Sequence, residues 1–597
     1  MQLRIVLYIL VFMLVQSTVS AKVYYVSSQN GSDNNTGMSI TNSLKTLQKA
    51  ADISKPGDTI SVMQGTYLAL NSSAVLNIHH SGTKHAPIVF ECYHNQEVII
   101  QLSRSNWQGV NISAGTHDIV INGFHIIGIN RFLTWDGANR SRVSGLSKPE
   151  YNGTGIACSG TSQGVSVDSV ADIIIENCII QDCAQAGIST SHSDNITIRD
   201  NIVSYSCWYS SYDSSGISNW EDANVHKKKT NNWMKILGNT VFGCRDEIGT
   251  DPSPSTRWTI TDGNGIIVDD SYCDQTTGVP YTGSTLISNN LVHNCGGAGI
   301  RAFNSNSVDI VNNTTYHNAE SRSYADTKIS CGSIASQSTF LKDNYYLGGT
   351  PASDFTGVEN ESLLGSIAPV PTAVFHYERK GIPNQNNDSF TYIIHEVPLR
   401  SYEIVLLFSE DHWHNADERQ FNVSVNGNRW LTNFDIFAAA GADLKAIAEI
   451  THDTSDPKGD IRLTFEPGKC GNPIVNGIEV LSDQSSQPNE IDLICNKPSL
   501  IQGVYHIQNN IICPNVSAAA VHIVNIPKDC IVDGFNIYYN GSRKHPYTSI
   551  DGIGDLWINP QFINPGLGAR SNFRLASNSP AIGSGLKGSN RGCLFPR

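Results

Sequence analysis

The segment IIIENCIIQDC at residues 173–183 decides the fold, because its pattern returns along the chain. Each copy has β-branched residues, then asparagine, two or three apolar residues and a polar corner; other copies are ITIRDNIVSYSC (196–207), WMKILGNTVFGC (233–244), LISNNLVHNC (286–295) and VDIVNNTTYHN (308–318). The central asparagines at 177 and 201 are 24 residues apart, and those at 290 and 313 are 23 apart. This period is typical of a β-solenoid, in which each coil is stable only when stacked and the asparagines line up as a ladder.

Composition and charge exclude several classes of protein. The chain has 597 residues, a formal net charge of −14 and no sustained basic stripe. Nucleic-acid binding depends on clustered lysine and arginine, so we expect no nucleic-acid partner. Fifty glycines, 22 tyrosines and only 5 methionines favour turn-dense β structure over helical bundles.

The first residues have the pattern of a secretion signal. A basic start at Met1 to Arg4 is followed by an apolar run over 5–15 and by the small residues Val19-Ser20-Ala21. We predict a signal peptide over 1–21, no membrane span, and a secreted, extracellular protein, because the apolar run is shorter than the roughly 20 residues that cross a bilayer. About fourteen Asn-x-Ser/Thr sequons, including Asn30, Asn71 and Asn540, predict a glycoprotein with about half of them used.

The cysteines are expected to form disulfide bonds rather than a metal site. There are fourteen, and no pair of Cys-x-x-Cys motifs suggests zinc. Cys178, Cys183 and Cys207 are close in sequence and could lie on neighbouring coils of the repeat. Buried free thiols are an equal alternative for these three residues.

Both ends of the repeat carry further motifs. LKTLQKAADISKPGDTISVMQGTY (44–67) resembles the cap helix, turn and first strand of many secreted β-helices, and APIVFECYHNQEVII (86–100) resembles their next coil. WINPQFINPG (557–566) and NFRLASNSPAIGSG (572–585) are similar to the closing segment of the same group. The chain therefore resembles right-handed parallel β-helix proteins of the pectate-lyase-like fold, and we assign 22–365 and 498–597 to this all-β solenoid.

Residues 366–482 lose the asparagine repeat and instead show alternating strands. YEIVLLFSEDHW, RQFNVSVNGNRWLTNFDIFAAAG and GNPIVNGIEVL closely resemble the malectin-like carbohydrate-binding domain, whose fold is a β-sandwich. Solenoid coils resume near residue 500, so we interpret the sandwich as an insertion into the β-helix.

The malectin resemblance implies that aromatic side chains at loop tips bind a neutral sugar. On this sequence the aromatic pair falls on His412 and Trp413, with Tyr377 or a neighbour as a third contact. The chain departs from the family at three points: Gly471 stands where an acidic residue is usual, His412 where tyrosine is usual, and a first strand is missing. Trp413 fits equally well as a rim tryptophan that packs on its own loop.

A recurring Gly-Ile pair predicts the register of the solenoid strands. It occurs at Gly187-Ile188, Gly216-Ile217, Gly265-Ile266 and Gly299-Ile300. If each isoleucine points inward, the second and fourth residues after the glycine point outward and stack on successive coils. The expected face then carries Arg301 and a run of acidic and aromatic residues, namely His192, Trp220, Glu221, Asp269, Asp270 and Phe303. We interpret this face as a groove for an extended polysaccharide, with Trp220 and Phe303 as sugar contacts.

These residues suggest a polysaccharide lyase that acts on an acidic polysaccharide by calcium-assisted β-elimination. Calcium needs several carboxylate oxygens, and Asp262, Asp269 and Asp270 are the candidate ligands, with Glu221, Asp222, Asp246 and Glu247 as further donors. Arg301, or a lysine of the 227–229 run such as Lys228, is the candidate base. The complete calcium-and-lysine signature of the better-known pectate lyases is absent. Equally simple roles exist: the aspartates can bond turn amides, and the lysines can lie on a solvated loop.

Two other functions fit the same sequence. A metal-independent glycoside hydrolase needs two carboxyl groups about 5 to 9.5 Å apart, and Asp269 with Glu221 on neighbouring coils is the candidate pair. A non-catalytic extracellular glycan-binding or adhesion protein would use the β-helix as a scaffold.

Overall fold

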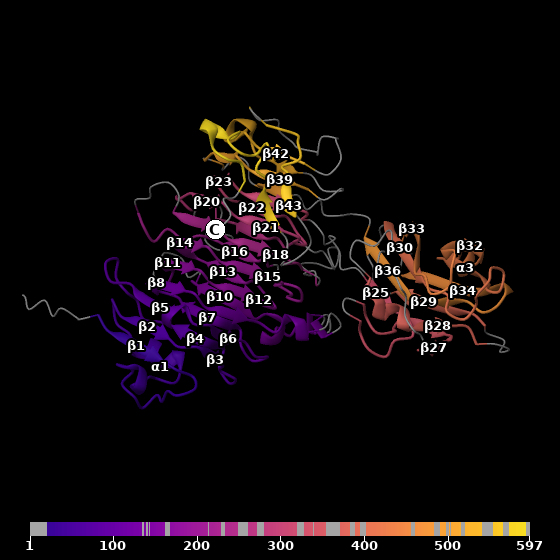
Figure 1. Cartoon of the computed structure of the whole chain (residues 1–597), viewed down its shortest axis with the longest axis horizontal. Coiled ribbons are helices and arrows are strands. Elements are labelled where there is room, and N and C mark those ends of the chain that lie inside the picture. Colours follow the sequence, from indigo (N-terminus) through magenta and orange to yellow (C-terminus); the bar gives the residue numbers. More distant parts are fainter. Residues whose placement is uncertain are drawn as a thin grey trace, which may run out of the picture.

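A computed structural model defines the fold. It describes residues 21–592 except for 134–136, 139–140, 143, 162–167, 213, 228–232, 247, 249–260, 272–279, 319–326, 338–339, 354–369, 383–387, 395–400, 455–459, 483–489, 497–500, 502, 515–519, 540–552, 554 and 565–571. In these residues, three long parallel sheets form a solenoid, and antiparallel sheets form a second lobe (Figure 1). The predicted all-β fold class, a parallel solenoid interrupted by a β-sandwich, is confirmed.

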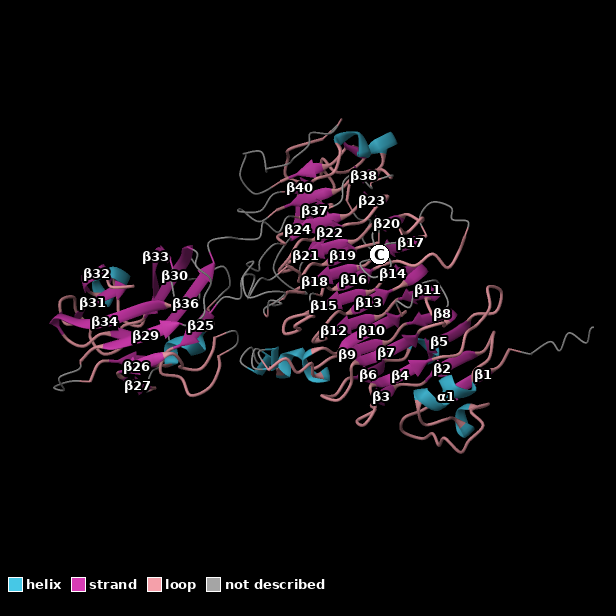
Figure 2. Cartoon of the chain, turned by 180° about the vertical axis from the view of Figure 1, so that it is seen from behind, coloured by secondary structure: helices cyan, strands magenta, loops and turns pink. Residues whose placement is uncertain are grey.

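The complete coils of the solenoid each contribute one strand to each of three sheets, and the coils at its two ends contribute fewer (Figure 2). The nine-stranded sheet contains β4 (Ala74–Ile78), β7 (Gln108–Ser113), β10 (Thr154–Ser159), β13 (Ile188–Ser191), β16 (Ile217–Trp220), β19 (Ile266–Asp269), β22 (Ile300–Phe303), β37 (Ile491–Ile494) and β40 (Val521–Val524). The eleven-stranded sheet contains β1 (Val23–Val26), β2 (Thr59–Val62), β5 (Ile88–Cys92), β8 (His117–Asn122), β11 (Val170–Glu176), β14 (Ser193–Arg199), β17 (Met234–Leu237), β20 (Thr285–Ser288), β23 (Val308–Val311), β38 (Tyr505–Gln508) and β41 (Ile531–Gly534). The ten-stranded sheet contains β3 (Gly65–Tyr67), β6 (Val98–Gln101), β9 (His125–Ile127), β12 (Ile179–Gln181), β15 (Ile202–Ser204), β18 (Thr240–Phe242), β21 (Leu291–His293), β24 (Thr314–Tyr316), β39 (Ile511–Cys513) and β42 (Ile537–Tyr538).

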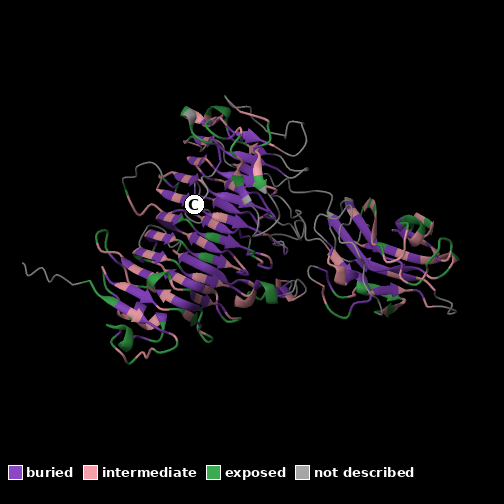
Figure 3. Cartoon of the chain, viewed as in Figure 1, coloured by how far each residue is buried: buried purple, intermediate pink, exposed green. Residues whose placement is uncertain are grey.

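Aliphatic columns fill the inside of the solenoid (Figure 3). Ile188, Ile217, Ile266 and Ile300 pair directly on successive strands, and each is fully buried. The predicted register of the Gly-Ile repeat is therefore confirmed. Strands of alternating pattern stay in this register because a slip of one residue would turn every isoleucine to the solvent.

An asparagine ladder runs along the corner between the eleven- and ten-stranded sheets. Its buried members are Asn201, Asn239, Asn290, Asn313, Asn510 and Asn536, and each side chain bonds the backbone of neighbouring coils. Asn177 is not a member, contrary to the prediction, because Cys178 occupies its ladder position and donates its N–H to Asn201. Asn177 instead lies exposed at the preceding corner residue, with a φ of 55°. The true spacing is thus one residue shorter than the 24 read from the sequence.

Short elements close the two ends of the solenoid. The predicted cap helix is α1 (Leu47–Ile53), which is capped by the side chain of Thr46 and buries Leu47, Ala50 and Ala51 against the first coil. The first strand is β1, ahead of this helix, rather than the strand after it. At the other end, β43 (Phe562–Asn564) and β44 (Asn572–Leu575) form an antiparallel pair, and Phe573 packs on Leu291.

The second lobe is a β-sandwich with its own core. One sheet contains β25 (Thr327–Ser330), β36 (Gly477–Ser482), β30 (Ser401–Phe408) and β33 (Ile447–Thr454); another contains β26 (Tyr346–Gly348), β29 (Phe390–Ile394), β34 (Ile461–Cys470), β31 (Gln420–Val425) and β32 (Asn428–Phe434). The third contains β27 (Thr350–Ala352), β28 (Glu378–Lys380) and β35 (Ile474–Val475), and helix α3 (Ile436–Ala440) follows β32. The lobe begins at β25, which pairs with β36, and so the boundary expected at 366 lies too late. The strand missing from the sequence pattern is part of this earlier segment.

The described cysteines form no disulfide bonds. Twelve are free thiols, and all except Cys470 and Cys530 are buried. Burial raises the pKa of Cys158 and Cys178 to about 12, which suppresses the reactive thiolate. The expectation of disulfides is thus wrong for these twelve, and the ten buried ones fill the interior of the fold as small apolar residues.

The helices of the described segments include none with the length and apolar character needed to span a membrane. The predicted signal peptide lies outside the described residues, apart from its last residue, Ala21.

Candidate functional site

The outward face of the nine-stranded sheet carries the residues singled out from the sequence. At the last position of each strand, Trp220 pairs with Asp269 and Asp269 with Phe303, so these three side chains stand side by side across β16, β19 and β22. All three are partly exposed. Two positions earlier, Arg301 on β22 pairs with Asp492 on β37, and Asp492 pairs with His522 on β40.

Arg301, Asp492 and His522 form a connected polar cluster. Arg301 donates from Nε and Nη2 to Oδ2 of Asp492 at 3.0 and 2.9 Å, and the other carboxylate oxygen lies 2.9 Å from Nδ1 of His522. The Asp492 side chain is 1% exposed, whereas that of His522 is 31% exposed. A carboxylate only accepts hydrogen bonds, so this contact places the proton of His522 on Nδ1 and leaves Nε2 with a lone pair.

The charges around Arg301 determine what its guanidinium can do. Burial by itself lowers the pKa of Arg301, but the negative charges of Asp492 and Asp262 outweigh it and the pKa is raised. Arg301 also donates to the carbonyl of Thr261. A guanidinium held in its charged form is suited to stabilising negative charge, and not to accepting a proton as the predicted base.

Neighbouring side chains donate hydrogen bonds to two of the three predicted calcium ligands. Asp262 accepts hydrogen bonds from Ser215 and Asn264, and Asp270 accepts one from Asn304. Among the residues that the structure describes, no three histidine, cysteine, aspartate or glutamate side chains are grouped so as to hold a metal ion. Calcium binding by Asp262, Asp269 and Asp270 therefore stays a prediction.

The corner after the nine-stranded sheet explains why two candidates leave the exposed face. His192, Glu221, Asp270 and Asn304 all have φ between 43° and 50°. This left-handed conformation ends each strand and turns the side chain away from the sheet face. Glu221 is fully buried with Nε2 of His192 at 2.8 Å, and Asp270 is 1% exposed.

The further calcium donors and the candidate lysines lie away from the exposed face or outside the described residues. Asp222 and Asp246 are buried, and they accept hydrogen bonds from Asn219 and from the amide of Ile248. Lys227 is exposed, whereas Lys228, Lys229 and Glu247 lie outside the described residues.

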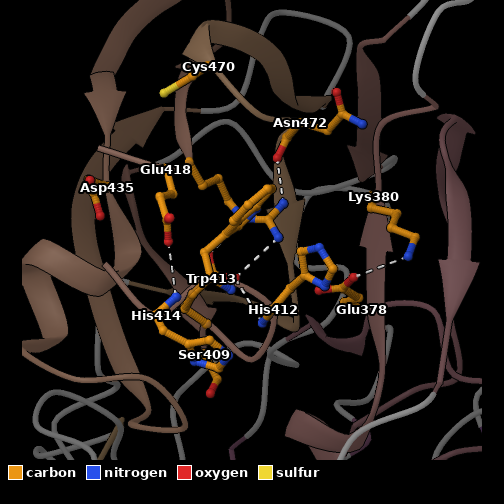
Figure 4. A network of polar contacts seen from close by, with 12 residues as sticks. Glu378, Lys380, Ser409, His412, Trp413, His414, Glu418, Asp435, Cys470 and Asn472 are labelled. Atoms are coloured by element: carbon orange, nitrogen blue, oxygen red, sulfur yellow. Dashed lines mark hydrogen bonds and ion pairs between the residues drawn. The ribbon is translucent and has the colours of Figure 1, made fainter. Parts of the chain in front are cut away.

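In the sandwich, a buried ion pair fixes the loop that follows β30 (Figure 4). Arg419 donates to both carboxylate oxygens of Glu410 at 2.7 and 3.2 Å, and Glu410 also accepts from the backbone amides of His412 and Trp413. The two rings meet edge to face, with centroids 4.8 Å apart. His412 is exposed and Trp413 is partly exposed. The Arg419–Glu410 ion pair therefore holds both rings at the tip of the loop.

Beside this loop, β28 contributes a charged pair that the sequence did not suggest. Glu378 is 3% exposed, and Nζ of Lys380 lies 3.8 Å from its Oε1. Burial raises the pKa of Glu378 to about 7, although the charge of Arg419 opposes this. Tyr377, the predicted third contact, is half-buried, and its carbonyl accepts a hydrogen bond from Asn476.

Sequence reasoning missed Asp492 and His522. Both lie after the insertion, 191 or more residues from Arg301, so no local pattern connects them. The available signal was the strand at 491–494, whose isoleucine continues the inward column of the Gly-Ile repeat.

These features define a parallel β-helix protein with an inserted malectin domain. Residues 24–251 match the family model described as a Pel9A-like, right-handed β-helix region, and residues 325–478 match the model of the malectin domain. The second match begins ahead of β25, in agreement with the boundary of the sandwich. Both predicted resemblances are thereby confirmed.

Individual proteins resemble only parts of the chain. An uncharacterized protein, YwoF, of Bacillus subtilis (strain 168) is 31% identical over 144 residues, which are 24% of this chain and 27% of that protein. A β-glucuronidase of Bacteroides uniformis is 21% identical, over 27% of this chain and 18% of its own, with a TM-score of 0.21. The ectodomain of ANX2 from Arabidopsis thaliana is 17% identical, over 29% of this chain and 52% of its own, with a TM-score of 0.23. The chain thus spans well under two thirds of each.

Proposed function

We propose that this protein is a secreted carbohydrate-active enzyme that cleaves an acidic polysaccharide by β-elimination on the nine-stranded face, and that its malectin domain binds sugar. The observation that carries the proposal is the cluster of Arg301, Asp492 and His522. It places a fixed positive charge and an oriented imidazole next to the aromatic and acidic row of Trp220, Asp269 and Phe303.

His522 is the proposed base. Its Nε2 takes the proton from the ring carbon next to the uronate carboxyl group, and the electrons of that C–H bond form a double bond to the neighbouring carbon. The bond from that carbon to the glycosidic oxygen breaks, and the departing oxygen takes up a proton from water. The positive charge of Arg301 stabilises the negative charge that develops at the carboxyl group. Asp492 orients both groups and remains a positioning residue.

Calcium binding stays a prediction, and no step of this mechanism uses the ion. A bound cation would neutralise the uronate carboxyl group, which is the chemistry proposed above for Arg301. Activity measured with added calcium and then with a chelator separates the two possibilities, since a reaction that uses Arg301 alone continues in chelator.

The malectin domain supplies the proposed sugar contacts at His412 and Trp413. Aromatic rings held at a loop tip stack on the apolar faces of sugar rings. The chain returns from this domain to the solenoid at Glu490, two residues before Asp492. We propose that the malectin domain binds the same polysaccharide that the nine-stranded face cleaves.

The test is ultraviolet absorbance of the unsaturated uronate product, with the full mature chain on a panel of polyuronates. His522→Ala is expected to lower kcat by about 10²–10⁴-fold. His506→Ala is the matched control, because His506 pairs with Asp309 at 2.6 Å in a similar histidine–aspartate contact on the eleven-stranded sheet. Equal activity of the two variants, or no unsaturated product on any substrate, overturns the lyase proposal.

A second candidate function is glycan binding without catalysis. It is favoured by the internal hydrogen bonds of Asp262 and Asp270, which give these carboxylates structural roles. It predicts glycan-array binding that is lost in Trp413→Ala, together with no product on any polyuronate. The hydrolase alternative gains no support, since Glu221 is fully buried beside His192.

A further inference from the structure

A groove of about 780 Å³ lies over the eleven-stranded sheet, away from the nine-stranded face. Its floor is formed by outward residues of successive strands: Val120 on β8 pairs with Ile174 on β11, Ile174 with Thr197 on β14, and Thr197 with Lys235 on β17. The groove thus runs across the strands along the solenoid axis.

One side of the groove is a row of polar side chains in a fixed conformation. Asp118, Asp172 and Asn195 occupy equivalent positions near the starts of β8, β11 and β14, with φ of 54° to 57°. Nδ2 of Asn195 donates to Oδ1 of Asp172 at 2.5 Å. Carboxylate and amide groups repeated at the coil spacing of about 4.8 Å offer successive hydrogen-bond partners to an extended ligand.

The other side carries two rings on a rigid support. The rings of His226 and Trp233 lie with centroids 4.9 Å apart and an interplanar angle of 31°. Nε2 of His226 lies 3.0 Å from Asp172, and its backbone N–H donates to Asp194, which is fully buried and also accepts from Tyr281. The indole nitrogen of Trp233 is buried and has no hydrogen-bond partner among the described residues.

The two aspartates of the groove have partners among the described residues, whereas its two lysines form no ion pair there. Both aspartates have histidine partners, since His117 lies 2.8 Å from Asp118 and His226 lies 3.0 Å from Asp172. Lys84 and Lys235 also line the groove, and neither forms an ion pair with a described residue. The two ammonium groups are therefore available to pair with the acid groups of a ligand.

We propose that this groove is a second saccharide-binding site, which holds an acidic oligosaccharide chain along the solenoid axis. A sugar ring packs against Trp233, ring hydroxyls bond Asn195 and Thr197, and the acid groups pair with Lys84 and Lys235. The strands β5 to β17 span four coil steps, about 19 Å at 4.8 Å each, which is long enough for several sugar units. The site does not depend on catalysis, because it lies on a different sheet from the proposed active face.

Calorimetric titration of the full chain with an oligomer of galacturonic acid tests the proposal. To isolate this groove, every protein in the series carries Trp413→Ala, which removes the proposed malectin contact, and His522→Ala, which prevents turnover. In this background Lys84→Gln with Lys235→Gln is expected to weaken binding at least tenfold, and Trp233→Ala by a similar factor. Lys55→Gln is the matched control, because Lys55 is an exposed lysine near the N-terminal end of the solenoid.

Three further titrations test which interactions hold the ligand. Binding through the two lysines must weaken as salt is added, and a neutral oligosaccharide such as dextran must bind weakly. A sulfated oligosaccharide that binds more tightly than the uronate identifies the acid group as a sulfate ester. Unchanged affinity in both groove variants, or an equal loss in Lys55→Gln, overturns the proposal. The absorbance assay of product formation is separate, so failure of the lyase proposal does not imply failure of this site.

Discussion

At the scale of single residues, the stability of the fold depends most strongly on the partners of its buried charges. Asp492 is almost completely buried between a permanent cation and an imidazole. Removing one partner of a buried pair leaves the other charge without compensation, which costs far more than the pair itself contributes.

Asp492→Ala is accordingly expected to lower the free energy of unfolding by about 3–5 kcal/mol, measured by urea denaturation. Asp309→Ala is the control, since the side chains of Asp309 and His506 are 25% and 39% exposed, and it should cost about 1 kcal/mol or less. Similar losses of unfolding free energy in the two variants would show that burial of Asp492 between Arg301 and His522 adds no special stability.

His293 gives the fold a defined pH dependence. Its ring stacks on Phe242 and packs on Phe573, and burial lowers its pKa to about 4 against the opposing hydrogen bond with Asn294. The unfolded chain binds a proton at His293 near pH 6.5, whereas the folded chain does so only near 4, and therefore stability is lost as the pH falls through this window.

The size of this loss is about 3 kcal/mol between pH 7.5 and 4. His293→Phe keeps a ring between its aromatic neighbours and removes the titration. The difference in unfolding free energy between wild type and variant should therefore shift by this amount over the window. A constant difference would mean that the imidazole titrates normally in the folded protein.

At the scale of elements, the asparagine ladder connects the coils where the strands turn. The side chain of Asn290 accepts from the backbone and side chain of Asn239, and donates to Ile236 and Asn313. Short strands of three or four residues depend on such contacts, because they form few hydrogen bonds of their own.

Asn290→Ala should lower the unfolding free energy by at least about 3 kcal/mol, because several buried polar groups lose their partners at once. Asn122→Ala, which removes an exposed contact with Asn177, should change it by about 0.5 kcal/mol or less. Denaturation curves of the two variants provide the comparison, and comparable small effects would argue against a stabilising ladder.

At the scale of the whole molecule, the chain leaves and re-enters the solenoid at adjacent points. The backbone and side-chain nitrogens of Asn318 donate to the two carboxylate oxygens of Glu490 at 2.8 and 2.6 Å. Beyond this contact, Ile300 pairs with Ile491, so the coil after the insertion stacks on the coil before it.

Replacement of 320–488 by a short glycine–serine linker should therefore leave a cooperatively unfolding solenoid. Closing so short a gap costs little chain entropy. Product formation by the proposed active face should persist, and the glycan binding assigned to Trp413 should disappear. Loss of a cooperative thermal transition would contradict this modular organisation.

The sequence by itself determined the solenoid and its inward isoleucine register, because local periodicity carries these features, and its motifs identified the malectin insertion by their resemblance to that family. It placed Asn177 one residue off the ladder and put Glu221 and Asp270 on the exposed face, since a left-handed corner residue leaves no mark in a pattern of period two. Only the tertiary structure brought Asp492 and His522 to Arg301 and assembled the groove at Trp233. Stacking of parallel coils joins residues that are distant in the chain, and the side chains they present to one another depend on the path of every intervening turn.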